Sequence, residues 1–296
     1  MPPVVTLIVC TRNRAERLRT TLEHVGAIRS AVRWDLIVVD NGSTDGTAAV
    51  VEAFAARHPG VPTRLVPCEA PGNGAGRNAG ARQADGEVLS FVDDDCYVQP
   101  DHVDEVRRLF ADPDLHFAGG RIVLHDPTDA PLTINESSVP VRVPPGGWVI
   151  PSLVQGANLM VRRRSFLAVG GFDPMFGAGA AFTGEDADLC NRLNCRGFGG
   201  GYLAAPTVRH HHGRKPDGIG RHKRLYARGY GALLAKHLVF AGHSAIAARA
   251  MLRHARWLWA EGEAASLLPL LGGFASYCAA ALRPGARTAA VAEARP

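Results

Sequence analysis

The stretch EVLSFVDDDC, residues 87–96, runs from an apolar segment directly into three consecutive aspartates. Adjacent carboxylates repel one another, so such a run costs free energy unless a cation or solvent relieves the repulsion. A solvated acidic turn would explain the aspartates, and so would a divalent-metal site at the end of a strand. The segments around the stretch decide between these two explanations.

Four short apolar segments alternate with helix-like segments through the first third of the chain. The apolar segments are Val4–Cys10, Asp35–Asp40, Thr63–Cys68 and Glu87–Val92, and the helix-like segments cover residues 16–28, 47–58 and 76–84. Continuous apolar strands separated by helices indicate a parallel sheet that is covered on both faces. Right-handed crossovers would make this a doubly wound, Rossmann-like unit, in which ligands bind beyond the carboxyl ends of the strands. Residues 11–14, Asp40 and the aspartates all fall at those ends, so we expect one site to gather them.

The remaining chain is predicted to hold fewer strands and more helix. HFAGGRIVL (residues 116–124), GANLMVRR (156–163) and GYLAAPTVRHHH (201–212) indicate strands, and Asp126–Gly147 is rich in Pro, Thr and Ser and is predicted to be a long loop. GEDADLCNRLNCRGF (184–198) begins with acids and ends with Arg196-Gly197, as a capped helix should. Three helices are predicted over Arg221–Leu238, Ser244–Glu261 and Ala265–Leu282. We therefore expect an α/β domain over residues 1–215, a helical extension over 216–283 and a disordered tail over 284–296.

Composition is that of an ordinary globular protein: 296 residues, 46% hydrophobic and 21% charged, with a net charge of +5. The basic excess is concentrated between Arg209 and Arg256, which suits an anionic membrane surface, an acidic substrate or phosphates, although a solvated helical face would explain it too. Six cysteines without a C-x-x-C pair indicate buried thiols in a reducing compartment. The N-terminus does not resemble a signal peptide, and no window reaches the length of a membrane span.

These features predict a cytoplasmic protein with peripheral contact at the inner face of the membrane through its basic C-terminal helices, and no nucleic-acid partner. Trp257 and Trp259 lie on a basic amphipathic segment. They could dock on a membrane, and core packing or a homodimer interface would explain them equally well.

A dinucleotide site is the first alternative. GNGAGRNAG (residues 72–80) contains G-x-G-x-x-A, with the aspartates about twenty residues further on, where dinucleotide folds keep a ribose-binding acid. However, these glycines follow the third strand rather than the first, and Pro71 stands at the entry to the turn. A single ribose acid would also leave two aspartates unexplained.

The order of five motifs resembles glycosyltransferase family 2. They are VTLIVCTRNRAERL (5–18), DLIVVDNGSTDGT (35–47), GNGAGRNAGARQADGEVLSFVDDDC (72–96), GGFDPMFGAGAAFTGEDADLCNRL (170–193) and VRHHH (208–212). The resemblance covers roughly residues 4–215. It implies a GT-A fold, with a mostly parallel sheet flanked by helices, and inverting transfer from a nucleotide-sugar donor with Mg²⁺ or Mn²⁺ as cofactor.

The resemblance also implies roles for the residues at the strand ends. The three aspartates correspond to the family's D-x-D motif, with Asp95 as the metal ligand, Asp93 as a second ligand, and Asp94 or Asp93 at the ribose or acting through water. This fits the chemistry, because a nucleoside diphosphate leaves readily only when a hard cation neutralises its charge. The other donor-binding residues implied are Asp40 at the base, Thr11, Arg14 and Glu16 around the base and ribose, and Arg77 beside Asn78.

Asp186 resembles the family's catalytic aspartate, which takes the proton of the acceptor hydroxyl. Glu185 could raise the pKa of Asp186 by like-charge repulsion, or bind acceptor hydroxyls. Acids at these positions would also simply complement a helix N-terminus. The family's V-x-H pattern selects His210 as a metal ligand or a donor to the diphosphate. Because alternate strand residues face opposite ways, we expect His212 to share the side of His210 and His211 not to.

Departures from the family narrow the function. Processive members carry Q-x-x-R-W and membrane spans, which this sequence lacks, so transfer of a single sugar is expected. UDP-sugar is the first candidate for the donor by family frequency, with guanine and thymine nucleotides open, and the sequence does not identify the acceptor. Two alternatives remain: a nucleotidyltransferase that makes sugar nucleotides, and a non-catalytic module that binds a nucleotide sugar or carbohydrate.

Overall fold

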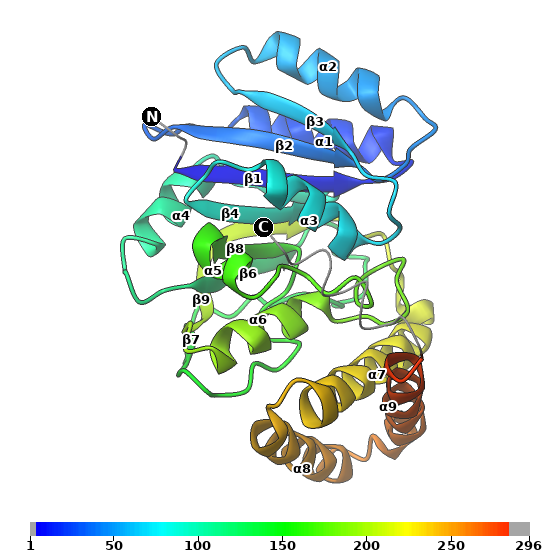
Figure 1. Ribbon diagram of the computed structural model, residues 1–296. Coiled ribbons are helices and arrows are strands. Elements are labelled where there is room, and N and C mark those ends of the chain that lie inside the picture. The colour runs from blue at the N-terminus through cyan, green and yellow to red at the C-terminus, as the bar shows by residue number, and fades with distance from the viewer. Residues whose placement is uncertain (1–3, 284–296) are drawn as a thin grey trace.

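The computed structural model describes residues 4–283, and its centre is a single nine-stranded sheet. The strands are β1 (Val5–Thr11), β2 (Trp34–Asp40), β3 (Thr63–Pro67), β4 (Val88–Asp93), β5 (Cys96–Val98), β6 (Phe117–Leu124), β7 (Val141–Val143), β8 (Asn158–Arg162) and β9 (Gly200–His210). They are ordered β3-β2-β1-β4-β8-β6-β9-β5, with β7 paired to β9 (Figure 1). The tail predicted over 284–296 lies outside the described residues.

The sheet is mixed. Strands β1 to β4 pair in parallel, as the alternation of strands and helices predicts, and β9 runs parallel to β6. Strand β8 is antiparallel to both β4 and β6, and β5 and β7 are antiparallel to β9. The α/β class is therefore confirmed, while half of the sheet departs from the expected parallel arrangement. The segment predicted to be a loop over 126–147 contains β7, a three-residue strand stabilised by its pairing with the start of β9.

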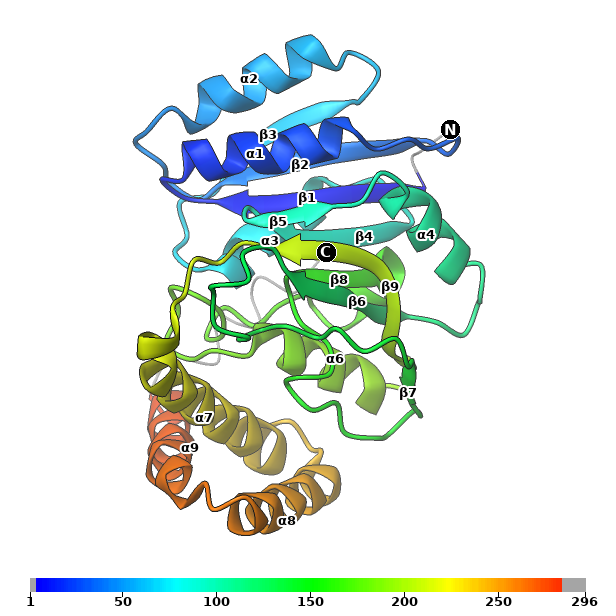
Figure 2. The ribbon, with the colours of Figure 1, turned by 180° about the vertical axis from the view of Figure 1, so that it is seen from behind.

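Helices before β9 cover both faces of the sheet, and further helices follow β9. The helices are α1 (Ala15–Gly26), α2 (Thr47–Arg57), α3 (Asn73–Gln83), α4 (His102–Leu109), α5 (Arg163–Ala168), α6 (Glu185–Cys195), α7 (Ile219–Ala235), α8 (Ser244–Ala260) and α9 (Leu267–Ala281), with short 3-10 turns η1 (Pro216–Gly218) and η3 (Ala264–Ser266) and a π-helical turn η2 (Lys236–Phe240). Helices α3, α5 and α6 lie on the face seen in Figure 1, and α1, α2 and α4 on the face seen in Figure 2.

Alternation along β1 shows how one apolar segment serves both layers. Leu7 and Val9 pack in the core that includes Leu18 of α1 and Phe54 of α2, whereas Ile8 packs in the core that includes Ala79 of α3. Successive strand residues point to opposite faces, so a strand buried on both sides is apolar at most of its positions. The buried polar residues Thr6 of β1 and Ser90 of β4 have hydrogen-bond partners in Asp35 and His102.

The carboxyl ends of the parallel strands meet at one edge of the sheet. Thr11 pairs in register with Asp40, and Cys10 pairs with Asp93. The chain then turns through Asp94 and Asp95 into β5, whose Cys96 pairs with His210 at the end of β9. Four segments that are far apart in the sequence therefore end beside one another, as the sequence predicts for residues 11–14, Asp40 and Asp93–Asp95, and His210 joins them.

Helices α7, α8 and α9 gather at one end of the molecule, beside α6 (Figure 1). The predicted domain boundary at residue 215 falls between the end of β9 and the start of η1. A core that includes Tyr230, Leu270 and Tyr277 from these helices also contains Phe176 and Phe182 from the loop before α6. Within residues 4–283, no helix has the length and apolar character needed to cross a bilayer.

Candidate active site

The three aspartates after β4 point to different partners. Asp93 accepts a 2.7 Å hydrogen bond from Arg77 Nη2. Asp94 accepts one of 2.7 Å from Thr11 Oγ1 and one from Arg14 Nη1. Asp95 accepts a 2.7 Å bond from Arg14 Nη2 through one oxygen, and its other oxygen lies 3.3 Å from His210 Nε2. The repulsion among the carboxylates is thus relieved by two arginines and a histidine rather than by water alone.

The neighbouring Arg14 and His210 shift the pKa values of Asp94 and Asp95 by different amounts. Burial raises the pKa of Asp94 to about 7, in spite of Arg14 and Thr11. Burial also acts to raise the pKa of Asp95, but the hydrogen bond and charge of His210, and then Arg14, outweigh it and hold that pKa below its usual range. Asp95 is therefore the carboxylate of this pair that is ionised most readily.

One group of side chains at this edge could hold a cation. Ligand atoms of Asp93, Asp95, Cys96 and His210 all lie within 4.8 Å of one another. Carboxylate oxygens suit Mg²⁺ and Mn²⁺, and imidazole is an acceptable ligand for the softer of the two. Cys96 does not suit a hard cation, because burial raises the pKa of its thiol well above the ordinary value and keeps it protonated. Asp93, Asp95 and His210 therefore fit the predicted cofactor.

Arg77 connects this edge to the start of α6. Its side chain is buried, and its Nη2 donates to Asp93 while its Nη1 donates to Glu185 Oε1 at 2.8 Å. Nη2 also reaches the carbonyl of Gly156 at 3.1 Å. A Cβ on Gly156 would lie 2.6 Å from Arg77 Nη1, so the approach requires glycine. The sequence singled out Arg77 and Glu185 separately, and the structure shows that they are partners.

Asp186 follows Glu185 in the first turn of α6. Its Oδ2 accepts a 2.8 Å hydrogen bond from the backbone N–H of Gly156, and its Oδ1 accepts one from Ala187. Burial, followed by the negative charge of Glu185, raises the pKa of Asp186 to about 7. The N-cap residue Gly184 has φ +101°, a left-handed conformation that favours glycine and turns the chain sharply into the helix. A carboxylate with such a pKa is suited to accept a proton near neutral pH.

Asp188, two residues further on, faces a different environment. Its fully buried carboxylate contacts Arg192 Nε at 2.8 Å, Lys236 Nζ at 2.7 Å and His237 Nε2 at 3.1 Å. Lys236 also pairs with Asp173 at 2.6 Å. Burial acts to raise the pKa of Asp188, but Arg192 and Lys236 outweigh it and lower that pKa well below the ordinary value. This cluster cannot be recognised from the sequence alone, because Lys236 and His237 come from the π-helical turn η2, far along the chain.

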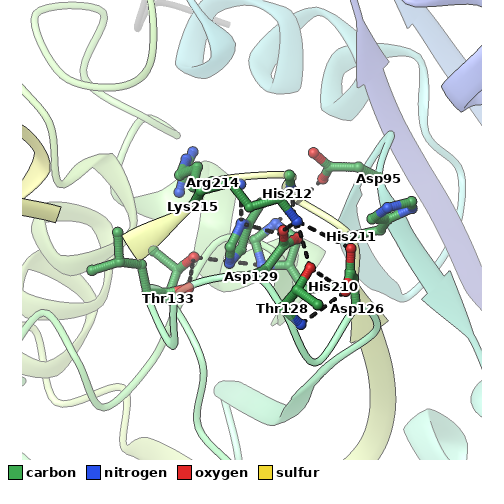
Figure 3. Close-up of polar contacts among 12 residues, drawn as sticks. Asp95, Asp126, Thr128, Asp129, Thr133, His210, His211, His212, Arg214 and Lys215 are labelled. Carbon is green, nitrogen blue, oxygen red and sulfur yellow. Dashed lines mark hydrogen bonds and ion pairs between the residues drawn. The ribbon is translucent and has the colours of Figure 1, made fainter. Parts of the chain in front are cut away.

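The histidines after β9 alternate as predicted (Figure 3). His210 faces Asp95 and lies edge-on to the ring of His212 at 5.0 Å, whereas His211 Nδ1 lies 3.0 Å from the hydroxyl of Tyr97. Next to them, Asp126, Asp129 and His211 form a second group with cation-ligand spacing. The ammonium of Lys215 already pairs with Asp126 at 3.2 Å and with Asp129 at 2.7 Å, so a side-chain cation neutralises this second group.

Two predicted donor-binding residues lie apart from the aspartates. Glu16 is largely exposed, with 84% of its side chain accessible, and its nearest charged partner is Arg19 at 3.4 Å. Asp40 lies at the same strand edge, but its Oδ1 accepts a 2.8 Å hydrogen bond from the backbone N–H of Ser43 and so stabilises the turn after β2. The structure therefore brings Thr11, Arg14, Arg77 and the aspartates into one network, with Asp40 beside it and Glu16 outside it.

Comparison with known families agrees with this geometry. The model of glycosyl transferase family 2 matches residues 6–166, and that of glycosyl transferase family group 2 matches residues 89–291. The chain belongs to glycosyl transferase family 2. The resemblance that the five motifs carry is thereby confirmed.

Individual relatives match shorter parts of their own chains. Glycosyltransferase AglE of Haloferax volcanii is 34% identical over 95 residues, which is 32% of this chain and 31% of AglE. Validoxylamine A glucosyltransferase of Streptomyces hygroscopicus is 27% identical over 232 residues, covering 66% of this chain and 52% of that protein. In the first curated relatives, the match spans 31%, 31% and 24% of their length, about a third or less.

Solved structures show the same fold. Mannosyltransferase PcManGT from Pyrobaculum calidifontis, in complex with GDP-Man and Mn²⁺, has a TM-score of 0.59 at 22% identity and covers 99% of this chain and 85% of that one. TarS of S. aureus in complex with UDP-GlcNAc has a TM-score of 0.55 at 16% identity, covering 81% and 73%. At these identities the likeness establishes the fold, and the expected GT-A architecture with a helical C-terminal region is confirmed.

Proposed function

We propose that the chain is an inverting, non-processive glycosyltransferase that moves one sugar from a nucleotide-diphosphate sugar to an acceptor hydroxyl. The observation that carries the proposal is the buried arginine Arg77. It bonds both Asp93, in the aspartate cluster, and Glu185, next to Asp186. A candidate donor site and a candidate base are therefore held in one rigid network, as transfer between two bound substrates requires.

On the donor side, Asp93, Asp95 and His210 are the residues that would hold Mg²⁺ or Mn²⁺, which when bound would neutralise the charge of the leaving diphosphate. The mannosyltransferase with the same fold was solved with Mn²⁺, which supports a divalent metal. We assign the donor nucleotide to the adjoining strand edge, where Thr11, Arg14 and Asp94 form a hydrogen-bonded group and Asp40 lies one strand away. The role of Glu16 stays a sequence-based prediction.

On the acceptor side, Asp186 would act as the base. As the acceptor oxygen forms its bond to the anomeric carbon, its proton passes to the Asp186 carboxylate, and the bond from the anomeric carbon to the diphosphate breaks with its electron pair on the phosphate oxygen. Attack opposite the leaving group inverts the anomeric centre. Backbone N–H groups of Gly156 and Ala187 fix the orientation of the carboxylate. Burial, and then the negative charge of Glu185, raises the pKa of Asp186 and so makes it more basic.

The two alternative functions make different demands on Asp186. A nucleotidyltransferase would use the nucleotide site and the metal, but would form sugar nucleotides from a sugar phosphate and a nucleoside triphosphate. A non-catalytic module would need the aspartate cluster and would not need a base. A buried carboxylate with a pKa of about 7 at the end of the same network favours transfer over both.

The first experiment is calorimetric titration of the protein with UDP, GDP and dTDP, in Mn²⁺ and in EDTA, repeated on Asp95→Ala. The expected result is binding of one nucleotide that depends on metal and is lost in the variant. Binding of none of the three, or binding of NAD without metal, would overturn the proposal. UDP is the first candidate; the neighbours that were solved with GDP-Man and UDP-GlcNAc keep both bases in the test.

Turnover separates the remaining functions. With the matching nucleotide sugar, donor cleavage in wild type that disappears in Asp186→Asn while nucleotide binding persists indicates transfer that uses this base. Donor cleavage that survives Asp186→Asn but fails in Asp95→Ala would indicate spontaneous hydrolysis of a metal-bound donor. NMR of the product anomer, β from an α-linked donor, would then test inversion.

A further inference from the structure

The C-terminal helices carry most of the large apolar side chains that are exposed on the described part of the chain. Nine of thirteen lie between residues 219 and 283: Leu225, Val239, Leu252, Trp257, Trp259, Leu267, Leu268, Leu271 and Leu282. Trp259 is 89% exposed and Leu268 is 79% exposed. Scattered exposed apolar residues are normal, but this concentration in α7, α8, α9 and the residues that adjoin them marks an interaction surface.

Helix α9 is well packed on the side that faces α7 and the core, so the exposure of its other side does not reflect poor packing. Gly273 lies so close to α7 that an added Cβ would meet the carbonyl of Arg228, and Leu270 and Tyr277 are buried in the core beside Phe176. The sequence of α9, LLPLLGGFASYCAAA, contains no charged residue. It is therefore apolar on both sides, a pattern of helices that have a partner on each side.

Charge around the apolar residues is strongly basic. The exposed cations between residues 216 and 283 are Arg221, Lys223, Arg224, Arg228, Arg249, Arg253, Arg256 and Arg283. The acids in the same range are Asp217, Glu261 and Glu263, and Glu263 is paired with Lys223 at 2.9 Å. Leu252, Arg256 and Trp259 fall on one side of α8 at helical spacing. Tryptophan and leucine next to arginine are characteristic of helices that lie in the interface of an anionic membrane.

The surface also adjoins the acceptor side of the site. Helix α7 starts a few residues after His210 and His212, and Arg214 Nη1 donates to the hydroxyl of Tyr226 on α7 at 3.3 Å. Thr183, just before Glu185, donates to the carbonyl of Leu225 at 3.3 Å. A membrane in contact with α7 would therefore lie next to Glu185 and Asp186, the residues that we propose to act on the acceptor.

We propose that α7, α8 and α9 form a docking surface for an anionic lipid bilayer, with Trp259, Leu268 and Leu271 entering the interface and the arginines of α7 and α8 meeting the headgroups. Charge decides for a bilayer over a second copy of this chain. A symmetric dimer through this surface would place its excess arginines opposite one another, and like charges across an interface are destabilising. Anionic headgroups instead supply the opposite charge, and each nearby Arg or Lys strengthens the attraction.

The test is co-sedimentation of the full chain with vesicles of phosphatidylcholine alone, and of phosphatidylcholine with about a third phosphatidylglycerol. Trp259→Ser combined with Leu268→Ser removes two exposed apolar side chains and no buried contact. The matched control is Val139→Ser combined with Leu167→Ser. These two residues lie outside the C-terminal helices, and their exposed fractions are 65% and 48%. Binding to the anionic vesicles is expected, weakened at least about tenfold in the first variant and unchanged in the control.

Each other outcome overturns the proposal. If the wild type stays in the supernatant with anionic vesicles, the helices do not bind a bilayer. If it binds both kinds of vesicle equally, the arginines do not contribute to binding. Equal binding of the two double variants moves the contact elsewhere. Light scattering that shows a dimer in wild type and a monomer in Trp259→Ser with Leu268→Ser assigns the surface to a second copy. Nucleotide titration without vesicles is independent of all these results, so failure here is distinguishable from failure of the proposed transfer activity.

Discussion

The first turn of α6 holds two buried aspartates with opposite chemistry. Asp186 is bonded by backbone N–H groups of Gly156 and Ala187, and its pKa rises to about 7. Asp188 is bonded by the cations Arg192 and Lys236, and its pKa falls well below the ordinary value. Burial acts in the same direction on both, so the difference comes from the neighbouring charges: the negative charge of Glu185 adds to the effect of burial on Asp186, whereas Arg192 and Lys236 outweigh burial at Asp188.

This difference separates a group that can exchange a proton from a group that holds the fold together. The cations around Asp188 keep it ionised at any physiological pH, and it in turn neutralises cations buried with it. The negative charge of Asp186 is only partly compensated, so its carboxylate takes up a proton near neutral pH.

Replacing Asp186 with Asn keeps the shape of the side chain and removes the base. We expect turnover with the matching nucleotide sugar to fall about 10²–10⁴-fold, the usual contribution of a general base. Nucleotide affinity should not change, because Asp186 contacts no residue of the aspartate cluster directly. Steady-state kinetics with calorimetry checks both, and turnover within a few fold of wild type would show that Asp186 is not the base.

Replacing Asp188 with Asn should instead lower stability, because it leaves the partly buried Arg192 without its counter-charge and the buried Lys236 with Asp173 alone. Removing one partner of a buried ion pair costs about 3–5 kcal/mol of unfolding free energy. Urea denaturation measures the loss, with the exposed Asp217→Asn as control. Adding Lys236→Met to the variant should restore part of the stability. A loss no larger than that of the control would contradict the assignment.

Replacing Arg77 with Lys keeps the positive charge but cannot bond Asp93, Glu185 and the carbonyl of Gly156 at once. We expect turnover to fall roughly 10²-fold, because a displacement of about 1 Å between reacting groups has that effect. Thermal unfolding of the variant must be followed in parallel. Full turnover in a folded Arg77→Lys protein would mean that the link between the two halves of the site is dispensable.

The pH dependence should differ in sign between the two aspartates. Turnover at low substrate should fall about tenfold per pH unit below about 7, since Asp186 must be deprotonated to act as the base. For stability, Asp186 has a folded pKa above its unfolded value, so its protonated form favours folding, and that contribution is lost as pH rises toward 7. Asp188 has a folded pKa below its unfolded value, so its contribution is present at neutral pH and is lost on acidification.

Denaturation of wild type, Asp186→Asn and Asp188→Asn at several pH values separates these contributions. Between about pH 4 and 7, Asp186→Asn should remove a decrease of stability with rising pH. Asp188→Asn should remove a decrease of stability with falling pH at the acid end. Parallel curves for all three proteins would show that neither pKa is shifted as the contacts indicate.

Much of the site could be predicted from sequence because it lies at strand ends. The apolar runs that end at Thr11, Asp40 and Asp93 are each buried on both faces, which the composition of the runs reveals, and parallel strands bring their carboxyl ends to one edge. The alternation that places His210 with His212, and His211 apart, follows in the same way from the two-residue period of a strand.

The partners of these residues depended on the tertiary structure. Nothing in the sequence links Arg77 to Glu185 or Asp188 to Lys236, because each pair is separated by dozens of residues and forms only when α6 packs against the sheet and against η2. The antiparallel insertion of β8 between β4 and β6 was likewise missed, since an apolar strand carries no mark of its direction.

The α/β class, the strand edge that carries the polar residues and the family of the motifs all follow from the amino-acid sequence, because each depends on local periodicity and the order of short motifs. Packing in three dimensions is needed to tell which of the acids is a candidate base and which belongs to a structural ion pair. The reason is that burial and the distance to the nearest cation set the pKa of a carboxylate, and both are properties of the packed chain.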